Sequence, residues 1–294
     1  MKKKYELTEE TMSVGSHTLH RIKALKNFGN VKVGDLGGWV EKKANLSQDG
    51  YCWVYDNAMV YGCAEVYGNA NVHGNARIYG DARVFEYAYV YGCAEVYGKA
   101  RVFGNAKVYG DARVCGNAMV YDNANVHGNA RIYDDAKVYG CAKVYGDAKV
   151  YGSAKVYGNA NVYGNARIYD DAKVYGCAWV SDNAEVFGNA KVYDYVGVGE
   201  FARVEGKAEV CNVVLVRSHA YICDNAVIKG KEDYIVFQNW WSSGRFFTWT
   251  RSNNMWKVGC FYGTGRELVA KAYADSVSKG KEYEKVVNYV KTCL

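Results

Sequence analysis

The stretches ANVHGNARIYDDAKVYGCA (residues 124–142) and ANVYGNARIYDDAKVYGCA (residues 160–178) are identical except at His127 and Tyr163. The unit that they repeat, A-x-V-Y-G-x, is much shorter than the distance between them. A third relative, ANVHGNARIYGDARV, begins at Ala70. The starting positions 70, 124 and 160 differ by multiples of 18, so we expect three of the short units to form one turn of the structure.

Each unit predicts one short strand followed by one corner. In A-x-V, a small and a β-branched side chain alternate with a polar one, which is typical of a strand with one buried face. The following Tyr-Gly-Asn or Tyr-Gly-Asp joins residue types that accept a positive φ and form tight corners. If each corner turns the chain through about 120°, three units close one coil and the fourth strand stacks on the first.

The repeat runs from Cys52 to Lys231 without insertion or deletion, which makes thirty units. Its aliphatic residue is followed four places later by a small one, as from Val108 to Ala112. This pattern resembles that of hexapeptide-repeat proteins, and the resemblance implies an all-β solenoid, a left-handed parallel β-helix. Thirty units on three faces predict about ten coils and, at a strand spacing of about 4.8 Å, a prism roughly 45 to 50 Å long.

The outward residue x of each unit should form columns along the faces, with a step of three units. One column mixes bases and acids: Arg77, Glu95, Arg113, Arg131, Lys149, Arg167, Glu185 and Arg203. A second column is basic without an acid: Arg83, Arg101, Met119, Lys137, Lys155, Lys173 and Lys191. The basic column is interpreted as a solvated face that keeps the protein soluble or, alternatively, as a surface for an anion or an acidic partner.

Aromatic residues at the corners should stack in the same way. One edge carries Tyr67, Phe85, Phe103, Tyr121, Tyr139, Tyr157, Tyr175 and Tyr193. Such a ladder stabilises a solenoid by about 0.5 to 1.5 kcal/mol for each pair of rings. The alternative is self-association along this edge, which predicts a homo-oligomer, a dimer or a trimer.

The two ends lack the repeat and divide the chain into an N-terminal cap (1–51), the β-helix (52–231) and a C-terminal α+β domain (232–294). The stretch RIKALKNFGNVKVGDLGGWVE (21–41), followed by NLS (45–47), resembles the N-terminal segment of the YdcK-like, phage-associated family of hexapeptide-repeat proteins. We expect this segment to cover the first coil, because an uncapped solenoid exposes unpaired strand edges.

After the repeat, three strands are predicted at 234–237, 245–251 and 255–261, with a hairpin turn at 252–254. Two helices are predicted to follow, the first beginning at Thr264 or Gly265 and ending near Ser278, the second at 282–291. GCFYGT (259–264) also resembles the YdcK-like, phage-associated family.

The C-terminal domain provides most of the candidate ligand-binding residues. Tyr262, Gly263 and Thr264 precede a predicted helix, whose N-terminal N–H groups can hold an anion. Aromatic and basic residues nearby could stack on, or pair with, a nucleotide-like ligand. The complete set of candidates is Arg245, Trp241, Trp249, Arg251, Tyr262, Gly263, Thr264 and, in the N-terminal segment, Arg21. The alternative is that the aromatic residues form the core of the domain and that Thr264 is only an N-cap.

Composition excludes several classes of function. The formal net charge of +6 is only mildly basic, so we expect no specific nucleic-acid binding. No apolar run of about 18 residues and no export signal follow the basic start, which predicts a cytoplasmic protein without a membrane contact. The ten cysteines are expected to be thiols, and their spacing suggests no metal site. No cofactor is predicted.

These observations favour a non-enzymatic, oligomeric solenoid that binds a small anionic, nucleotide-like ligand through its terminal domains. The phage resemblance implies one version, sequestration of a host immune nucleotide signal. The first alternative is an acyl-CoA-dependent acyltransferase, since the best-known hexapeptide-repeat proteins use a histidine as general base and bind coenzyme A between subunits. Against it, His73 and His127 stand where the repeat has tyrosine, and no loop interrupts the coils. The second alternative is a structural or self-assembling scaffold.

Overall fold

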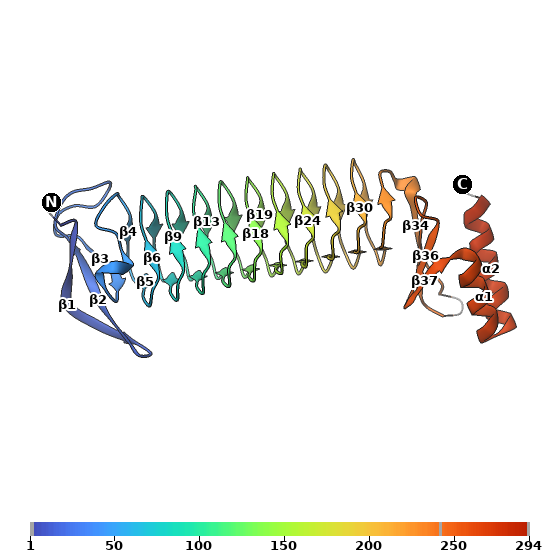
Figure 1. Ribbon diagram of the computed structural model, residues 1–294, viewed down its shortest axis with the longest axis horizontal. Helices are drawn as coiled ribbons and strands as arrows, with labels where there is room; N and C mark the ends of the chain where they lie inside the picture. Colours follow the sequence, from blue (N-terminus) through green and yellow to red (C-terminus); the bar gives the residue numbers. More distant parts are fainter. Residues whose placement is uncertain (1–2, 241–242, 293–294) are drawn as a thin grey trace.

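The computed structural model of the chain describes residues 3–240 and 243–292. Its three parts follow one another along an elongated molecule: a group of N-terminal strands, a long tube, and a C-terminal sheet with two helices (Figure 1). Within the described residues, no helix is both long enough and apolar enough to cross a membrane.

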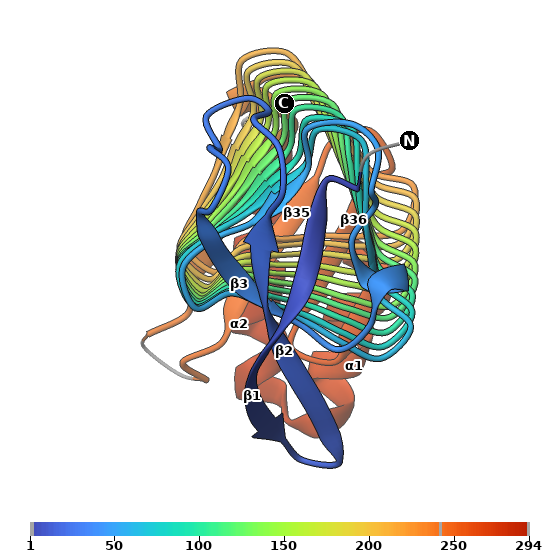
Figure 2. The same ribbon diagram turned by 90° about the vertical axis from the view of Figure 1, so that its left-hand side faces the viewer.

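The tube is built from a series of very short strands, from β4 (Trp53–Val54) to β33 (Val227–Ile228). Each strand pairs in parallel with the strand three further along, so that β13 (Lys107–Val108) lies between β10 (Tyr89–Val90) and β16 (Asn125–Val126). The coils lie one behind another with a three-sided outline (Figure 2). The predicted three-sided parallel solenoid, with three strands to a turn, is confirmed.

The interior of the tube is a continuous column of small and β-branched side chains. Ala106, Val108 and their equivalents in neighbouring coils are fully buried. At the corners, Gly110 has a φ of +71°, and a Cβ there would come within 3.0 Å of the backbone nitrogen of Gly128. Asp takes this position in some units: Asp134 has a φ of +58°, and its carboxylate accepts a hydrogen bond from the Gly152 N–H at 3.2 Å. Gly or Asp fills this corner in most units, and Glu86, Glu200, Asn212 and Ser218 take the same positive φ.

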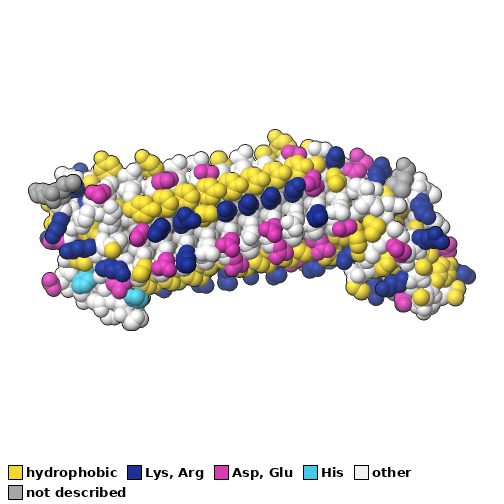
Figure 3. Space-filling model, in the orientation of Figure 1, with side chains coloured by type: hydrophobic (Ala, Val, Ile, Leu, Met, Phe, Trp, Pro, Cys, Tyr) yellow, Lys and Arg dark blue, Asp and Glu magenta, His cyan; other side chains and the backbone are white. Residues whose placement is uncertain are grey.

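The outward columns run along the three faces as the sequence predicts. Figure 3 shows one row of Lys and Arg side chains along the tube, beside a stripe of hydrophobic side chains. In the basic column, Arg83 and Lys191 are paired with Glu65 (3.3 Å) and Glu209 (2.6 Å). Rings in the neighbouring ladder are nearly parallel and 4.8 Å apart between Tyr67 and Phe85.

The solenoid has a direction because the N–H groups of the outward and corner residues of each unit donate toward the C-terminal end. The Lys107 N–H, for example, donates to the Ala124 carbonyl of the following coil at 2.9 Å. The first coil therefore exposes more carbonyl acceptors than N–H donors, and the last coil more N–H donors than acceptors. The two end segments supply partners for these groups.

At the N-terminal end, the segment before the repeat adds a further, irregular turn, so that the tube has about 11 turns. β3 (Leu36–Val40) pairs in parallel with β5 (Met59–Val60), and Leu46 forms a parallel bridge with Val66. In both pairs the partners lie further apart in sequence than in the regular coils. The antiparallel strands β1 (Tyr5–Val14) and β2 (His17–Ala24) extend this sheet beyond β3.

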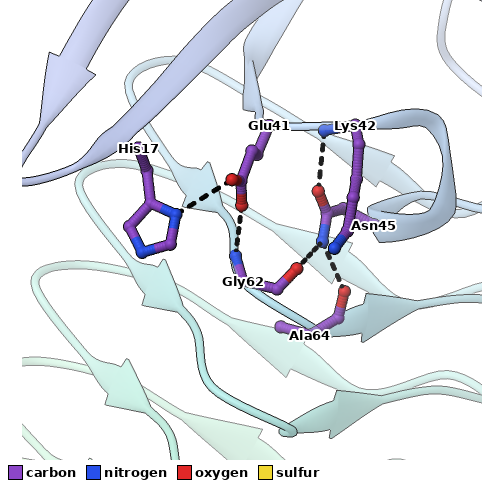
Figure 4. A network of polar contacts seen from close by, with 6 residues as sticks. All are labelled: His17, Glu41, Lys42, Asn45, Gly62 and Ala64. Carbon is purple, nitrogen blue, oxygen red and sulfur yellow. Dashed lines mark hydrogen bonds and ion pairs between the residues drawn. The ribbon is translucent and has the colours of Figure 1, made fainter.

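Asn45 joins the irregular turn to the first repeat coil (Figure 4). It ends the short 3-10 helix η1 (Lys43–Asn45) and is fully buried. Its side-chain amide donates to the carbonyls of Gly62 (3.1 Å) and Ala64 (2.8 Å), and its Oδ1 accepts from the Lys42 N–H. The first coil's carbonyls thus receive donors.

Glu41 lies next to this junction in the same figure. Its carboxylate accepts a hydrogen bond from the Gly62 N–H at 2.6 Å and contacts His17 Nδ1 at 2.9 Å. The hydrogen bond with His17, more than that with Gly62, lowers the pKa of Glu41. Glu41 therefore ties the β1–β2 hairpin to the tube.

At the C-terminal end, the turn η2 (Lys231–Asp233) leads into a separate antiparallel sheet. The sheet contains β34 (Tyr234–Gln238), β35 (Phe246–Thr250), β36 (Met255–Val258) and β37 (Phe261–Thr264) in that order. The helices α1 (Gly265–Asp275) and α2 (Val277–Thr292) pack on one of its faces. The predicted third strand at 255–261 is wrong, since it is two strands joined by a turn at Gly259, whose φ is +57°.

Candidate functional site

A groove of about 500 Å³ lies where the C-terminal sheet overhangs one face of the solenoid. Its solenoid side is formed around β29 (Arg203–Val204) and β32 (Tyr221–Ile222), and its other side around β35 and β36. We call it the basic groove, because three cationic and four aromatic or imidazole side chains line it: Arg203, Arg245, Lys257, Phe201, His219, Tyr221 and Phe246.

A stack of rings forms one wall of the basic groove. The His219 ring lies between Phe246, at 3.9 Å, and Phe201, at 4.9 Å. One turn of the solenoid before Phe201, the equivalent position is Asn183, which also lines the groove and carries no ring. The stack therefore ends at Phe201, whose side chain is 53% exposed. A planar ligand could continue the stack at this point.

Tyr221 forms the floor between the two sides. Its N–H donates to Thr248 Oγ1 at 3.0 Å, and its hydroxyl donates to Glu205 at 2.8 Å. Burial, and then the hydrogen bond to Glu205, raise the pKa of Tyr221, so the phenol stays neutral at physiological pH. The Lys257 ammonium lies 4.5 Å from the centre of its ring.

The charges in the basic groove are not all neutralised. Arg203 lies 3.4 Å from the Glu185 carboxylate. Neither Arg245 nor Lys257 forms an ion pair with any residue in 3–240 or 243–292. These two cations are therefore available to an anionic group of a ligand.

The structure separates the residues that were predicted to bind a ligand. Arg245 lines the basic groove, whereas Trp241 lies outside the described residues. Trp249 is 2% exposed in the core against the helices, and its indole N–H donates to Asn254. Arg251 is exposed, and its backbone N–H donates to the Asp233 carbonyl. Arg21 lies at the opposite end of the molecule, with its guanidinium 5.0 Å from the Trp39 ring.

The predicted anion cradle before α1 is already occupied by the chain itself. Thr264 caps the helix, and the Glu267 carboxylate accepts hydrogen bonds from the Thr264 N–H (2.8 Å) and hydroxyl (2.9 Å). Both bonds lower the pKa of Glu267. Gly263 is buried in β37, and the Tyr262 hydroxyl donates to Asp224 of the last coil at 3.1 Å. These residues have structural roles.

Trp249 and Thr264 do border a second hollow, together with Arg266 and Lys291. Its volume is about 170 Å³, a third of that of the basic groove. Typical ligand pockets have volumes of about 300 to 1,000 Å³. This hollow is therefore too small for a nucleotide.

One of the comparisons with known proteins matches the repeat. The family model described as the YdcK β-solenoid repeat matches residues 76–92 and 112–128. The solenoid is a YdcK-like β-helix. The "Uncharacterized acetyltransferase YdcK" of Escherichia coli (strain K12) is 34% identical to the chain over 62 residues, which cover 18% of this chain and 19% of that protein. The match thus spans less than a fifth of the relative's length.

Sequence reasoning missed Phe201, Arg203, His219 and Lys257. For Phe201 and His219, the repeat of the YdcK-like solenoid contains a sequence signal. Both stand at the exposed position directly before the buried small residue of a unit. This position holds Asn, Asp, Cys, Lys or Ser in most units, and an aromatic or imidazole ring only at Tyr51, Tyr87, Tyr195, Phe201 and His219. Rings at this position therefore mark places where the wall departs from its repeat.

The histidines in the middle of the YdcK-like solenoid occupy ring columns. His127 lies between Tyr109, at 4.7 Å, and Tyr145, at 5.0 Å. His73 stacks on Tyr55 at 4.1 Å. Burial lowers the pKa of both imidazoles. In the described part of the chain, no group of three or more His, Cys, Asp or Glu side chains is placed to hold a metal ion.

Proposed function

We propose that the chain is a binding protein that holds a small anionic, nucleotide-like ligand in the basic groove. The open end of the ring stack at Phe201, beside the cations of Arg245 and Lys257, is the observation that supports this proposal. A base would stack on Phe201, and a phosphate would accept hydrogen bonds from the two cations. Sequestration of a host nucleotide signal by a phage protein is a finer version of the same proposal.

Isothermal titration of the full chain with AMP, ATP and cyclic dinucleotides tests this proposal. We expect a dissociation constant in the micromolar range for at least one of them, and a loss of tenfold or more in Arg245→Ala and in Lys257→Ala. Arg131→Ala is the matched control, since Arg131 is an exposed arginine in the same column as Arg203 but far from the groove. The proposal fails if no nucleotide binds below about 1 mM, or if Arg245→Ala binds as tightly as the native chain.

Acyl transfer is the second candidate, favoured by the name of the Escherichia coli relative and by the imidazole of His219 in the groove. Acetyl-CoA itself carries an adenine nucleotide, so it belongs in the same titration series. An acetyltransferase would move the acetyl group to an amine or hydroxyl acceptor, whose proton passes to a base such as His219, and would release free coenzyme A thiol. A thiol reagent measures this release in the presence of candidate acceptors, and His219→Ala would abolish it. His73→Ala and His127→Ala report on the alternative of a base within the ring columns.

We also propose that the chain forms a homo-oligomer, because the exposed edges of the Tyr ladder could pack against a second copy. Sedimentation velocity of the purified chain measures this directly. A monomer at all concentrations would contradict it.

A further inference from the structure

A second groove, of about 360 Å³, lies at the N-terminal end of the solenoid. Here the turn around Phe28 overhangs the face formed by β4, β7 (Asn71–Val72) and β10, held by the packing of Phe28 on Trp53 at 5.3 Å. Aromatic rings and side-chain amides dominate its lining, notably Tyr51, Tyr87, Tyr89, Asn30, Asn69 and Asn71.

This groove is uncharged, and we call it the neutral groove. None of its lining residues is Asp, Glu, Lys or Arg. Its single histidine, His73, is half buried, and burial lowers its pKa, so it is neutral at pH 7. An anionic or cationic ligand would therefore lose hydration here without gaining a counter-charge.

Two rings of the neutral groove, Tyr51 and Tyr87, are more exposed than the stacked rings of the ladders. Tyr51 is 60% exposed and Tyr87 is 59% exposed. Both are among the rare rings at the position before the buried small residue. Neither closes a gap in the core, so packing of the solenoid does not explain them.

The spacing of these two tyrosines indicates the shape of a guest. They stand in one column, two coils apart, with Asn69 between them. Neighbouring coils are about 4.8 Å apart, so the backbone positions of Tyr51 and Tyr87, two coils apart, are separated by roughly 9.6 Å. A flat aromatic guest in contact with both rings needs only about 7 Å. A pyranose ring, with hydrogens on both faces, is thicker and fits the gap better.

The amides supply the polar groups that a sugar requires. Asn69 Oδ1 accepts from the Tyr51 N–H at 3.2 Å, and Asn71 Nδ2 donates to the Asn69 carbonyl at 2.9 Å. Each amide is thus fixed by one polar atom, which leaves the Asn69 NH₂ as a donor and the Asn71 Oδ1 as an acceptor. A hydroxyl group can bond to both, because it donates and accepts.

We infer that the neutral groove binds an uncharged oligosaccharide, with one pyranose ring between Tyr51 and Tyr87 and its hydroxyls on Asn69 and Asn71. This ligand differs from that of the basic groove. Phe201 and Tyr87 are more than six turns of the solenoid apart, so neither groove contributes to the other.

The test is an array of neutral gluco-, manno-, galacto- and N-acetylglucosamine oligosaccharides probed with the full chain, followed by calorimetric titration of the best-bound tetrasaccharide. We expect binding, at least a fivefold loss in Tyr87→Ala and in Asn69→Ala, and no change in Tyr195→Ala. Tyr195 is the matched control, because it stands in the same column, 66% exposed, at the other end.

Three outcomes overturn the inference: no neutral saccharide is bound, uronic acid oligomers are bound more tightly than neutral ones, or Tyr87→Ala and Asn69→Ala bind as the native chain does. If no saccharide binds and Tyr87→Ala lowers the sedimentation coefficient, the exposed rings are an interface with a second copy. An unchanged melting temperature of each variant shows that the substitution acts on the groove and not on the fold.

Discussion

The two ends of the tube solve opposite hydrogen-bonding problems. At the N-terminal end, donors cover the free carbonyls of the first coil, as the Asn45 amide does for Gly62 and Ala64. At the C-terminal end, acceptors cover the free N–H groups of the last coil: Thr248 Oγ1 accepts from Tyr221, and Ser252 Oγ accepts from Val227 at 2.7 Å. The difference follows from the direction of a parallel solenoid, in which one end has an excess of carbonyls and the other an excess of N–H groups.

The grooves beside these caps differ in the same systematic way. Both form where an end segment overhangs a flat face, and both contain rings at a position that most units fill with Asn or Asp. One groove has Arg245 and Lys257, whereas the other has amides and no charge. The uniform wall of the solenoid sets the spacing of the side chains in each groove. The rings that replace repeat residues, together with the end segments, determine which ligand groups each groove can contact.

Asn45→Ala removes the N-terminal cap contacts and should have the largest effect on stability. It leaves the buried Ala64 carbonyl, the half-buried Gly62 carbonyl and the Lys42 N–H without the bonds that Asn45 provides, and we expect a loss of about 2 to 3 kcal/mol in the free energy of unfolding. Urea denaturation measures this loss. Asn105→Ala, which removes an exposed amide contact to Asn123, should change it by less than about 0.5 kcal/mol. An equal effect of both variants would contradict a capping role for Asn45.

Thr248→Val is the corresponding change at the C-terminal end. Valine has nearly the same shape as threonine but cannot accept from the Tyr221 N–H, and Thr248 is only 2% exposed. We expect a loss of about 1 to 2 kcal/mol, smaller than at Asn45 because one bond is lost and not three. Thr248→Ser retains the hydroxyl and should recover most of the stability in the same denaturation experiment. If serine is no better than valine, the hydroxyl does not cap the last coil.

Phe201→Asn restores the residue type that the repeat usually has and sharpens the comparison between the grooves. It removes the outer ring of the stack, so the nucleotide-like ligand should bind about fivefold more weakly, which corresponds to about 1 kcal/mol. Tyr195→Asn makes the same change outside both grooves and should leave the affinity unchanged. Saccharide binding should be the same in both variants; a loss of it in Phe201→Asn would show that the two grooves are coupled.

The tube was predictable because every unit repeats the same pattern of residue types. Ala and Val alternate with a polar residue, which defines the strand. Gly or Asp, in most units, takes the positive φ of the corner. The turn of three units therefore follows from residue types within each unit. The irregular turn was not predictable, since residues before Cys52 lack the repeat and their pairs have a longer offset than the regular coils. The split at Gly259 was missed because apolar residues flank it on both sides.

The basic groove could be predicted only in part. Arg245, just before β35, was identified as a candidate. Arg203 lies in the solenoid and Lys257 in β36, and only the docking of the C-terminal sheet on the solenoid brings the three cations together. Trp249 was interpreted as a ligand contact, although strand alternation in β35 places it with Phe247 against the helices. Phe246 and Thr248, on the other side of the strand, face the solenoid. Sequence shows the alternation but not which side meets the tube.

Glu41→Gln should have the smallest effect and a distinctive dependence on pH. The contacts of Glu41 with His17 and Gly62 lower its pKa, so the folded state binds its proton less tightly than the unfolded state. The stabilisation is therefore complete above the unfolded-state pKa of about 4.3 and is lost as the pH falls through the lowered value. Because the Glu41 side chain is 25% exposed, we expect Glu41→Gln to lower the free energy of unfolding by only about 0.5 kcal/mol.

Melting curves should show native protein and Glu41→Gln differing at pH 7 and converging near pH 3. Glu9 is exposed, so Glu9→Gln should match native protein throughout. A difference that persists at low pH would mean that Glu41 acts through its shape and not through its charge, and that the N-terminal cap, like the neutral groove beside it, does not depend on ionisation.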